Sequence, residues 1–306
     1  MKKLTLIFVI IFSNVAFGNK IDELKTDKDV EDFIKTVAPE FVKKVWKDFD
    51  YGNFRIVSTD SIYTNLKCQK IFNQSDINNW KKVDINNDGL TDLLFIPHYY
   101  GYSQYAIIDQ GSNNFKLTRF IIDFSICEYV KPIKVKDKNE LQIRKVNLPF
   151  DFDDNIEKYI KIDTLTYKFN SFIELNDKVI IDNKIKSIEV KTDYCFGTCP
   201  VFKLTINKNG LAEFDGIEFT KFRGKSIKQF DPKNVAEIFD LLNYIEIKKL
   251  KDYYEVNYTD ASTATLDITF EDGSIKKIKD YGLSGTYGLS ALYSKLTKLA
   301  TETEWK

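Results

Sequence analysis

The sequence predicts an α+β protein with two domains behind a short N-terminal leader. Three observations lead to this fold class. An amphipathic helical stretch comes first, a long β-branched and aromatic part follows, and the last third groups its strands and helices in blocks. Such blocks favour antiparallel sheets with helices packed on one face. We expect a β-rich domain over residues 19–180, with two leading helices, and an α+β domain over residues 185–306, with two helices on one face.

The composition excludes several classes of protein. The 306 residues suffice for two domains at roughly 100–200 residues each. Lysine plus arginine and aspartate plus glutamate number 45 each, so no broad field favours nucleic acid or an anionic membrane. An apolar content of 43% supports a packed globular fold.

Residues 1–18, MKKLTLIFVIIFSNVAFG, have the three parts of a cleaved secretory signal. Lys2 and Lys3 precede an apolar run, and Ala16 and Gly18 provide small residues at the cleavage end. The run is shorter than the roughly 20 residues of a membrane helix. We expect cleavage near Gly18 and an exported mature chain, either periplasmic or secreted, with no membrane span.

The predicted elements of the first domain are helices and then strands. Residues 26–49 place apolar side chains three and four apart, and Pro39 divides them into two helices that cover a sheet. Strand-like runs separated by Asn, Asp and Gly then follow; they are FRIVSTDSIY, DLLFIPHYY, YAIIDQG, FKLTRFIIDFSICEYV, LQIRKV and TLTYKF.

The second domain begins after the polar segment 176–186. Strand IKSIEVK leads into a cysteine loop, and PVFKLTI, the turn NKNG and LAEFDG form a hairpin. Asp231 as a cap and Pro232 in the first turn predict a helix over 230–245. A second hairpin, TATLDITF and SIKKIKDYG around Glu271, precedes a final amphipathic helix over 284–305.

The segment WKKVDINNDGLTDLLFI spaces its oxygen side chains as a calcium loop does. Positions one, three, five and nine carry oxygen, a glycine at six permits the sharp turn, and the backbone carbonyl at seven is a further ligand. These residues are Asp84, Asn86, Asp88, Asp92, Gly89 and Leu90. An EF-hand is disfavoured because Phe95 stands at position twelve. The alternative is a solvated turn in which Asn and Asp bond the local backbone.

VDINNDGLTDLLF, followed by YAIIDQGSNNFK, resembles the Asp-rich loop and strand of FG-GAP and VCBS repeats over about residues 78–117. In that family the loop acids bind calcium, which the resemblance carries over to Asp84, Asn86, Asp88 and Asp92. Those repeats occur in series and build propellers, whereas this chain has one clear copy. The resemblance therefore implies a structural calcium ion in a loop that works alone.

All four cysteines, Cys68, Cys127, Cys195 and Cys199, follow the leader, and an exported chain favours disulfides. Gly197 lets YCFGTCPVF fold back and bring Cys195 to Cys199 as a local staple. Zinc would need four ligands, and the chain has one histidine. A redox pair remains an alternative, although it usually has two intervening residues at a helix N-terminus. Cys68 and Cys127 would form a second bridge.

CFGTCPVFKLTI, the NG turn and the final DYG and TEW resemble a family of exported bacterial domains of unknown function. Its hallmark is C-F/Y-G-T-C-P-V-Y/F followed by a strand and a turn. The resemblance covers about residues 185–305. It implies one compact α+β domain and says nothing about an activity.

Other residues with chemical potential favour plainer interpretations. His98 is the one imidazole base and lies beside a proline at a strand end. GLSGTYG lacks the lysine of a phosphate loop, and no G-x-S-x-G nucleophile elbow occurs. The acids of PFDFDDN (Asp151, Asp153 and Asp154) lie in a polar turn. The tyrosines Tyr99, Tyr100, Tyr102 and Tyr105 would either stack on sugar rings or pack a sheet.

The sequence thus favours a non-catalytic exported protein, a binding or envelope-associated module with structural calcium and disulfides. The alternative is an exported enzyme, either thiol-based through Cys195 and Cys199 or a hydrolase with an acidic cleft. A glycan or a protein is the partner class to consider, and nucleic acid is not.

Overall fold

The computed structural model describes residues 19–39, 54–65, 77–98, 103–121, 128–146, 160–256 and 258–306. The chain divides into two compact units. The N-terminal unit comprises Met1–Asn139 and Ile143–Lys161, and the C-terminal unit comprises Glu140–Gln142 and Ile162–Lys306. The predicted signal and the second predicted helix, beyond Pro39, lie outside the described residues.

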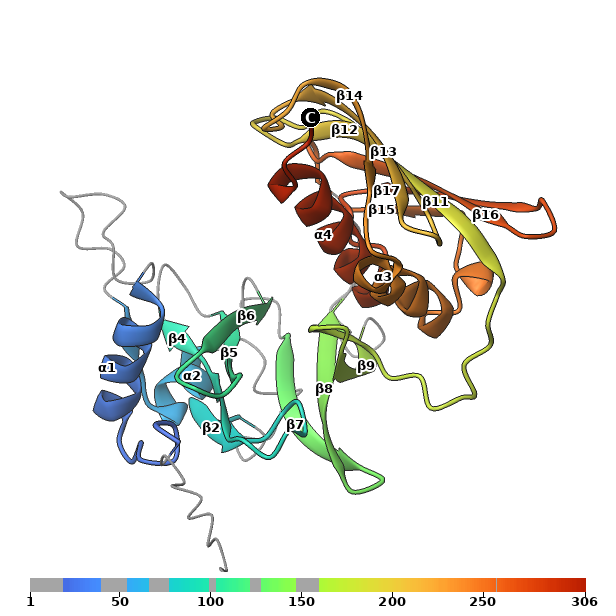
Figure 1. Ribbon diagram of the computed structural model, residues 1–306. Coiled ribbons are helices and arrows are strands. Elements are labelled where there is room, and N and C mark those ends of the chain that lie inside the picture. The colour runs from blue at the N-terminus through green and yellow to red at the C-terminus, as the bar shows by residue number, and fades with distance from the viewer. Residues whose placement is uncertain are drawn as a thin grey trace, which may run out of the picture. The chain divides into compact units, whose positions relative to one another are not determined.

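The N-terminal unit contains a four-stranded antiparallel sheet of order β2-β3-β5-β6 and a small β1-β4 pair. Figure 1 shows α1 at the N-terminal end of the described chain. The elements are α1 (Asp27–Val37), β1 (Arg55–Ile56), α2 (Thr59–Asn65), β2 (Trp80–Val83), β3 (Asp92–Phe95), β4 (Pro97–His98), β5 (Gln104–Asp109), β6 (Phe115–Ile121) and β7 (Tyr129–Val135). Strand β8 (Lys138–Val146) contains the point where the chain first passes between the units.

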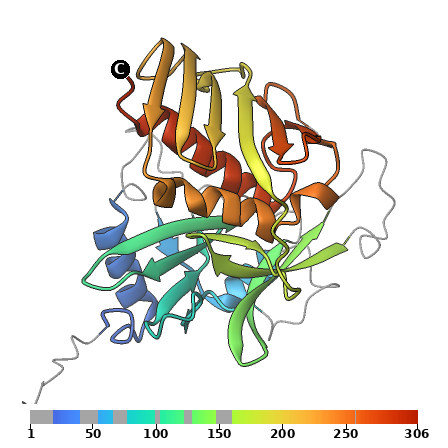
Figure 2. The same cartoon turned by 45° about the vertical axis from the view of Figure 1, so that its right-hand side comes forward.

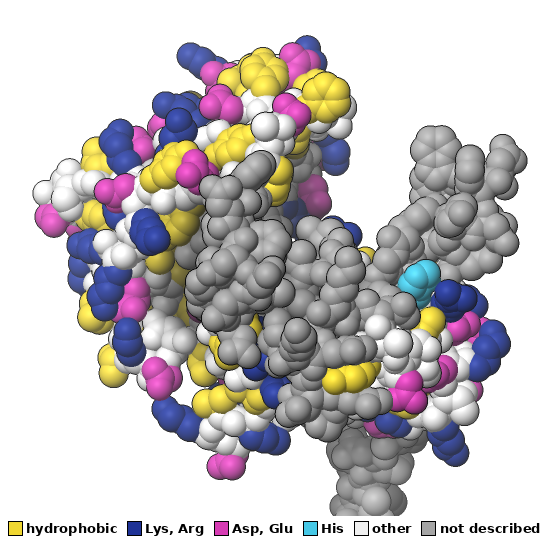
Figure 3. All heavy atoms as spheres, turned by 180° about the vertical axis from the view of Figure 1, so that it is seen from behind, with side chains coloured by type: hydrophobic (Ala, Val, Ile, Leu, Met, Phe, Trp, Pro, Cys, Tyr) yellow, Lys and Arg dark blue, Asp and Glu magenta, His cyan; other side chains and the backbone are white. Residues whose placement is uncertain are grey.

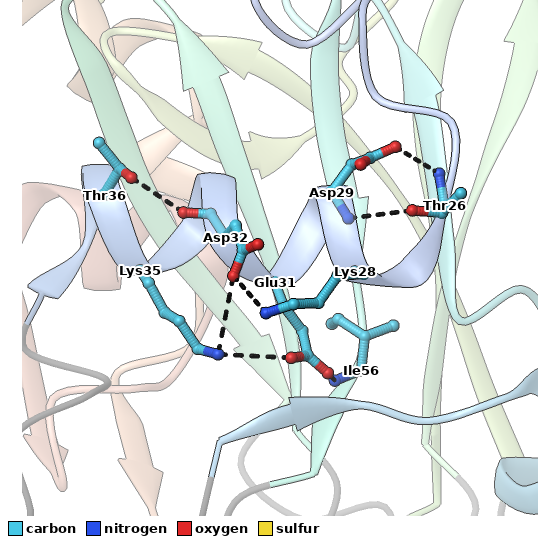
Figure 4. A network of polar contacts seen from close by, with 8 residues as sticks. All are labelled: Thr26, Lys28, Asp29, Glu31, Asp32, Lys35, Thr36 and Ile56. Carbon is cyan, nitrogen blue, oxygen red and sulfur yellow. Dashed lines mark hydrogen bonds and ion pairs between the residues drawn. The ribbon is translucent and has the colours of Figure 1, made fainter.

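Helix α1 begins with a capping box, and the Glu31 carboxylate joins it to strand β1 (Figure 4). The Thr26 hydroxyl accepts a hydrogen bond from Asp29 N at 3.1 Å, and Asp29 Oδ2 accepts one from Thr26 N at 2.9 Å. These bonds satisfy amides that a helix start leaves without partners. Glu31 pairs with Lys35 at 3.4 Å and also accepts a bond from Ile56 N at 3.0 Å. The helix is therefore positioned by polar bonds as well as by its apolar face.

The apolar face of α1 packs on the sheet, as the helical spacing predicts. Val30 and Ile34 are fully buried, and they share one core cluster with Leu93 and Ile107 from strands β3 and β5. Phe33 meets the Phe115 ring edge-on at 5.2 Å between centroids. Burial of these side chains, at about 1.5–3 kcal/mol each, holds the helix against the sheet.

The predicted strand over FRIVSTDSIY is wrong in its second half. Only β1 is extended there, and helix α2 follows at Thr59. The Ser58 hydroxyl accepts a hydrogen bond from Ser61 N at 3.2 Å, as an N-cap does. The run of Ser, Thr and Asp therefore starts a helix in place of continuing the strand.

The C-terminal unit is built on a seven-stranded sheet of order β14-β13-β12-β11-β16-β17-β15. Its neighbours are antiparallel except for the parallel pair β15 and β17. Helices α3 and α4 lie on the same face of this sheet in both ribbon views (Figures 1 and 2). The elements are β9 (Ile160–Lys168), β10 (Ser171–Glu174), β11 (Ile185–Thr192), β12 (Val201–Asn207), β13 (Leu211–Glu218), β14 (Gly224–Gln229), α3 (Pro232–Tyr244), a 3₁₀ turn (Ile247–Lys249), β15 (Tyr253–Glu255), β16 (Thr263–Phe270), β17 (Ile275–Tyr281) and α4 (Tyr287–Glu302).

Local sequence explains most of these elements. Asp231 accepts a hydrogen bond from Lys233 N at 2.9 Å and Pro232 opens α3, as predicted. Strand β16 alternates buried and half-buried residues along its whole length, so one face meets the helices. Trp305 closes the core: its ring stacks on Phe214 at 4.6 Å between centroids and is 6% exposed.

The structure also shows elements that the sequence analysis did not assign. Strand β14 pairs antiparallel with β13, and β10 pairs with β9. Residues 162–174 belong to the C-terminal unit, ahead of the polar segment 176–186 that the sequence predicts as the boundary.

The described surface carries both signs of charge. Lysine and arginine side chains alternate with aspartate and glutamate over the face drawn in Figure 3. Among the described helices, none combines the length and the apolar character that crossing a bilayer requires. The mixture of charges on this face agrees with the equal numbers of basic and acidic residues in the sequence.

Candidate functional site

The Asp-rich loop joins β2 to β3, and its first three predicted ligands lie together. Asp88 N donates to Asp84 Oδ1 at 3.1 Å and to Asn86 Oδ1 at 3.2 Å. The Asn86 amide donates to Asp88 Oδ2 at 2.8 Å. Asp84 and Asn86 thus share the Asp88 amide as a donor, and Asn86 also bonds the Asp88 carboxylate, so the side chains at positions one, three and five lie close together in the loop.

The backbone of the loop takes a conformation that suits this convergence. Gly89 has a φ of 88° and Asn87 a φ of 60°, in the region that glycine and asparagine tolerate. Asp84 Oδ2 accepts a hydrogen bond from Gly89 N at 3.0 Å, and Asp88 Oδ1 accepts one from Leu90 N at 2.8 Å. The turn is therefore wrapped around its own carboxylates.

Asp92, at position nine, is fully buried and is used differently. Its Oδ2 accepts from Ile85 N at 2.7 Å and from Asn86 N at 3.4 Å, and its Oδ1 accepts from Asp109 N at 2.8 Å. Burial raises the pKa of this carboxyl to about 7, although the three amide donors favour the carboxylate. Asp92 thus joins the loop to the end of β5.

A second residue pair fixes the loop from outside, and sequence reasoning missed it. Asn87 Nδ2 donates to Asn139 O, and Asn139 N donates to Asn87 Oδ1, both at 2.8 Å. Asn139 Nδ2 also donates to Asp84 O at 2.7 Å. The two asparagines are 52 positions apart, so no local pattern could have paired them.

The donor set fits a hard cation better than a transition metal. Asp84, Asn86 and Asp88 offer oxygen, and Leu90 offers a carbonyl, which are ligands that calcium takes. Within the described ranges, no group of three or more His, Cys, Asp or Glu side chains has an arrangement that would hold a metal ion. The side chains at positions one, three and five thus have the ligand atoms that calcium takes, while the Asp92 oxygens face backbone amides. A carboxylate oxygen has two lone pairs, so Asp92 Oδ1, which accepts one amide, keeps one for a cation, whereas Oδ2 accepts two amides.

The cysteine loop contains a disulfide between β11 and β12. Cys195 and Cys199 are bonded, with their Cα atoms 5.8 Å apart, and Gly197 has a φ of 139°. Phe196 N donates to Asp260 O at 3.0 Å, which holds the loop to the segment before β16. The Thr192 hydroxyl donates to Pro200 O at 2.8 Å and accepts from Phe202 N at 3.1 Å, so the strands re-pair directly after the loop.

The surroundings of this disulfide do not resemble those of a redox enzyme. Both cysteines lie in a loop between strands, and neither begins a helix whose dipole would lower a thiol pKa. The loop instead presents Phe196, which is 88% exposed, and Tyr194 beside it. Cys68 and Cys127 lie outside the described residues.

The glycine-rich segment GLSGTYG binds carboxylates of its own chain. Asp280, which is fully buried, accepts from Ser284 N at 3.2 Å and from Gly285 N at 2.9 Å. Glu174 accepts from Tyr287 N at 2.7 Å and from Gly288 N at 2.8 Å. These amides at the start of α4 are where a phosphate would bind, and the two acids already occupy them.

Of the remaining candidates, the structure describes His98 and Tyr105. His98 lies in β4 opposite Arg55, and burial and this cation lower the pKa of its imidazole. Tyr105 is half-buried and stacks on Phe95 at 5.7 Å between centroids, so it packs the sheet. The other predicted tyrosines and the acids of PFDFDDN lie outside the described residues; they are Tyr99, Tyr100, Tyr102, Asp151, Asp153 and Asp154.

Comparison with known proteins identifies the C-terminal part. Residues 186–300 match the family model described as a domain of unknown function, DUF6438. This match confirms the prediction of a C-terminal domain of unknown function, and the cysteine motif as the hallmark of that family stays a prediction. Comparisons with curated proteins and with solved structures found no match. The resemblance of the Asp-rich loop to FG-GAP and VCBS repeats stays a prediction.

Proposed function

We propose that this chain is an exported, non-catalytic binding or envelope-associated module whose N-terminal unit is stabilised by calcium. The ion would be held by Asp84, Asn86 and Asp88, by the carbonyl of Leu90, and by a free lone pair of Asp92. The observation that carries this proposal is the convergence of three oxygen side chains in one loop.

The role of the ion would be structural. The loop connects two paired strands, and Asn139 ties it to the start of β8. A cation would neutralise carboxylates that otherwise repel one another, and it would fix the register of β2 against β3. Extracellular calcium modules bind at about 10⁻⁴–10⁻³ M, which suits a chain exported to a calcium-containing medium.

Two features support a binding role over catalysis. The glycine-rich loop is filled by Asp280 and Glu174, and the cysteines form a disulfide. The signal-like leader supports export, since it places the cysteines where disulfides persist. The partner would be a glycan or a protein that contacts exposed side chains such as Phe196 and Tyr194.

Calorimetric titration with CaCl₂ tests this proposal. Calcium affinity depends on ligand charge, so Asp88→Asn should weaken binding about tenfold. Asp137→Asn is the matched control: Asp137 is also exposed in the N-terminal unit, and its positive φ tolerates asparagine. Equal affinities for the two variants, or no heat with the parent chain after chelator treatment, would contradict the proposal.

A further inference from the structure

The segment between β10 and β11 exposes three consecutive aliphatic side chains. Val179 is 89% exposed, Ile180 41% and Ile181 64%. Figure 1 shows this yellow-green segment leaving β10 and running outward before it enters β11. Exposed apolar residues are common singly, but a contiguous run marks a contact surface.

The segment is anchored at both ends. Asn176 donates from its backbone to the Tyr244 hydroxyl at 2.9 Å and from its amide to Tyr244 O at 2.7 Å. Asn183 N donates to Asn243 Oδ1 at 2.9 Å. Both anchors are at the end of α3, so the loop between them is held in place while its tip faces solvent. A fixed tip loses less conformational freedom when a partner binds.

The charges of the segment allow two copies of it to pair. We consider two copies of the segment that run antiparallel and are related by a two-fold axis at Ile180, so that each residue faces the one equally far from Ile180 on the other side. Lys178 of one copy then lies opposite Asp182 of the other, and Val179 lies opposite Ile181. Such an isologous contact repeats each pair twice, as two-fold interfaces do.

We propose that a second copy of this chain binds at residues 178–182, so that the protein forms a two-fold dimer. The three aliphatic side chains form the apolar centre of the interface. The ion pairs between Lys178 and Asp182 of the two copies flank this centre and fix the antiparallel orientation of the segments. The proposal is independent of the calcium site, which lies in the N-terminal unit.

The sheet edge offers a contrast that supports this choice. Strand β14 is an edge of the seven-stranded sheet and also exposes an isoleucine, Ile227, at 69%. A central antiparallel pairing of two β14 strands would place Lys225 opposite Lys228. Like charges facing each other oppose the pairing of two such edges, whereas two copies of the 178–182 segment would place opposite charges face to face.

The present partners of the two charges do not prevent the contact. Lys178 lies 3.5 Å from Glu246, and Asp182 accepts hydrogen bonds from Lys184 Nζ and Lys184 N, both at 2.9 Å. The side chains of Lys178 and Asp182 are themselves 66% and 46% exposed. Exposed ion pairs contribute little and exchange readily. Either charge can therefore turn to a second copy.

Sedimentation velocity on the purified chain, in a concentration series up to about 1 mM, tests the proposal because small interfaces associate weakly. We expect a monomer–dimer equilibrium in the parent chain. Ile180→Asp, which places two carboxylates face to face, should abolish the dimer. Ile227→Asp is the matched control and should leave the dimer unchanged.

Charge exchange makes the test specific to the two-fold arrangement. Lys178→Asp alone and Asp182→Lys alone should each weaken dimerisation about tenfold through like-charge contacts. The double variant restores opposite charges and should recover the parent dissociation constant. Far-ultraviolet circular dichroism and a thermal melt check that each variant folds. A monomer at every concentration, a dimer that survives Ile180→Asp, or a double variant as weak as the singles would overturn the proposal.

Discussion

Asp92 joins the Asp-rich loop to strand β5 in the N-terminal unit. It is buried, and its two oxygens receive amides from both the Asp-rich loop and strand β5. The sequence pattern identifies Asp92 as a loop acid. It does not reveal the bond to Asp109 N, nor the pair formed by Asn87 and Asn139, because these contacts join residues distant in the chain.

The pKa of Asp92 predicts how stability depends on pH without calcium. Burial raises it from an ordinary 3.8 to about 7, so between these values the folded chain keeps a proton that the unfolded chain releases. The free energy of unfolding should therefore fall as pH rises from about 4 to about 7, by at most about 1.4 kcal/mol per pH unit. Denaturation in chelator at several pH values measures this slope.

The variant Asp92→Asn supplies the comparison. Asparagine does not titrate in this range, so the decline with pH should be smaller in the variant than in the parent chain, whatever its absolute stability. Parallel pH curves for the two proteins would show that Asp92 does not titrate between pH 4 and 7.

At the scale of elements, capped helices and regular hairpins could be predicted from sequence, and weakly patterned strands could not. Asp231 and Pro232 define the start of α3, and turns with glycine define the two hairpins of the C-terminal unit. Strand β14 reads GKSIKQ, with a glycine and two lysines, and its pairing with β13 makes it a strand. Helix α2 was missed because its Ser58 cap lies inside a β-branched run.

Helix α4 begins on a carboxylate that comes from outside its own sequence. Glu174 of β10 accepts two amides of its first turn, at 2.7 and 2.8 Å. Charge-assisted bonds of this kind contribute about 1.5–3 kcal/mol each, so Glu174→Ala, which removes two of them, should reduce the free energy of unfolding by about 3–6 kcal/mol. Urea denaturation measures the loss. Glu213→Ala, at an exposed position of β13, is the control and should change it by less than about 0.5 kcal/mol.

At the scale of the whole molecule, the two units combine different means of stabilisation. The N-terminal unit has an acidic loop and a capped helix, and the C-terminal unit has a wide sheet, a two-helix layer and a disulfide. A feature of each unit could be predicted from sequence, because the Asp-rich spacing and the cysteine motif are local patterns. It could not place residues 162–174, whose contacts assign them to the C-terminal unit.

This division predicts that the disulfide and calcium act on different units. Replacing both Cys195 and Cys199 with alanine opens a short loop, so the C-terminal unit should lose about 2 kcal/mol. The response to calcium should be unchanged in that variant. Differential scanning calorimetry with and without calcium measures both effects, and a variant that no longer responds to calcium would show that the two are linked.

The most direct test of the calcium loop is a thermal melt of the chelator-treated chain with and without added calcium. At ten times the dissociation constant, binding stabilises the folded state by about 1.4 kcal/mol. For a unit of this size we expect the midpoint to rise by about 3–6 °C. Magnesium should raise it less, because it needs a stricter octahedral geometry. An unchanged midpoint in saturating calcium would contradict the account.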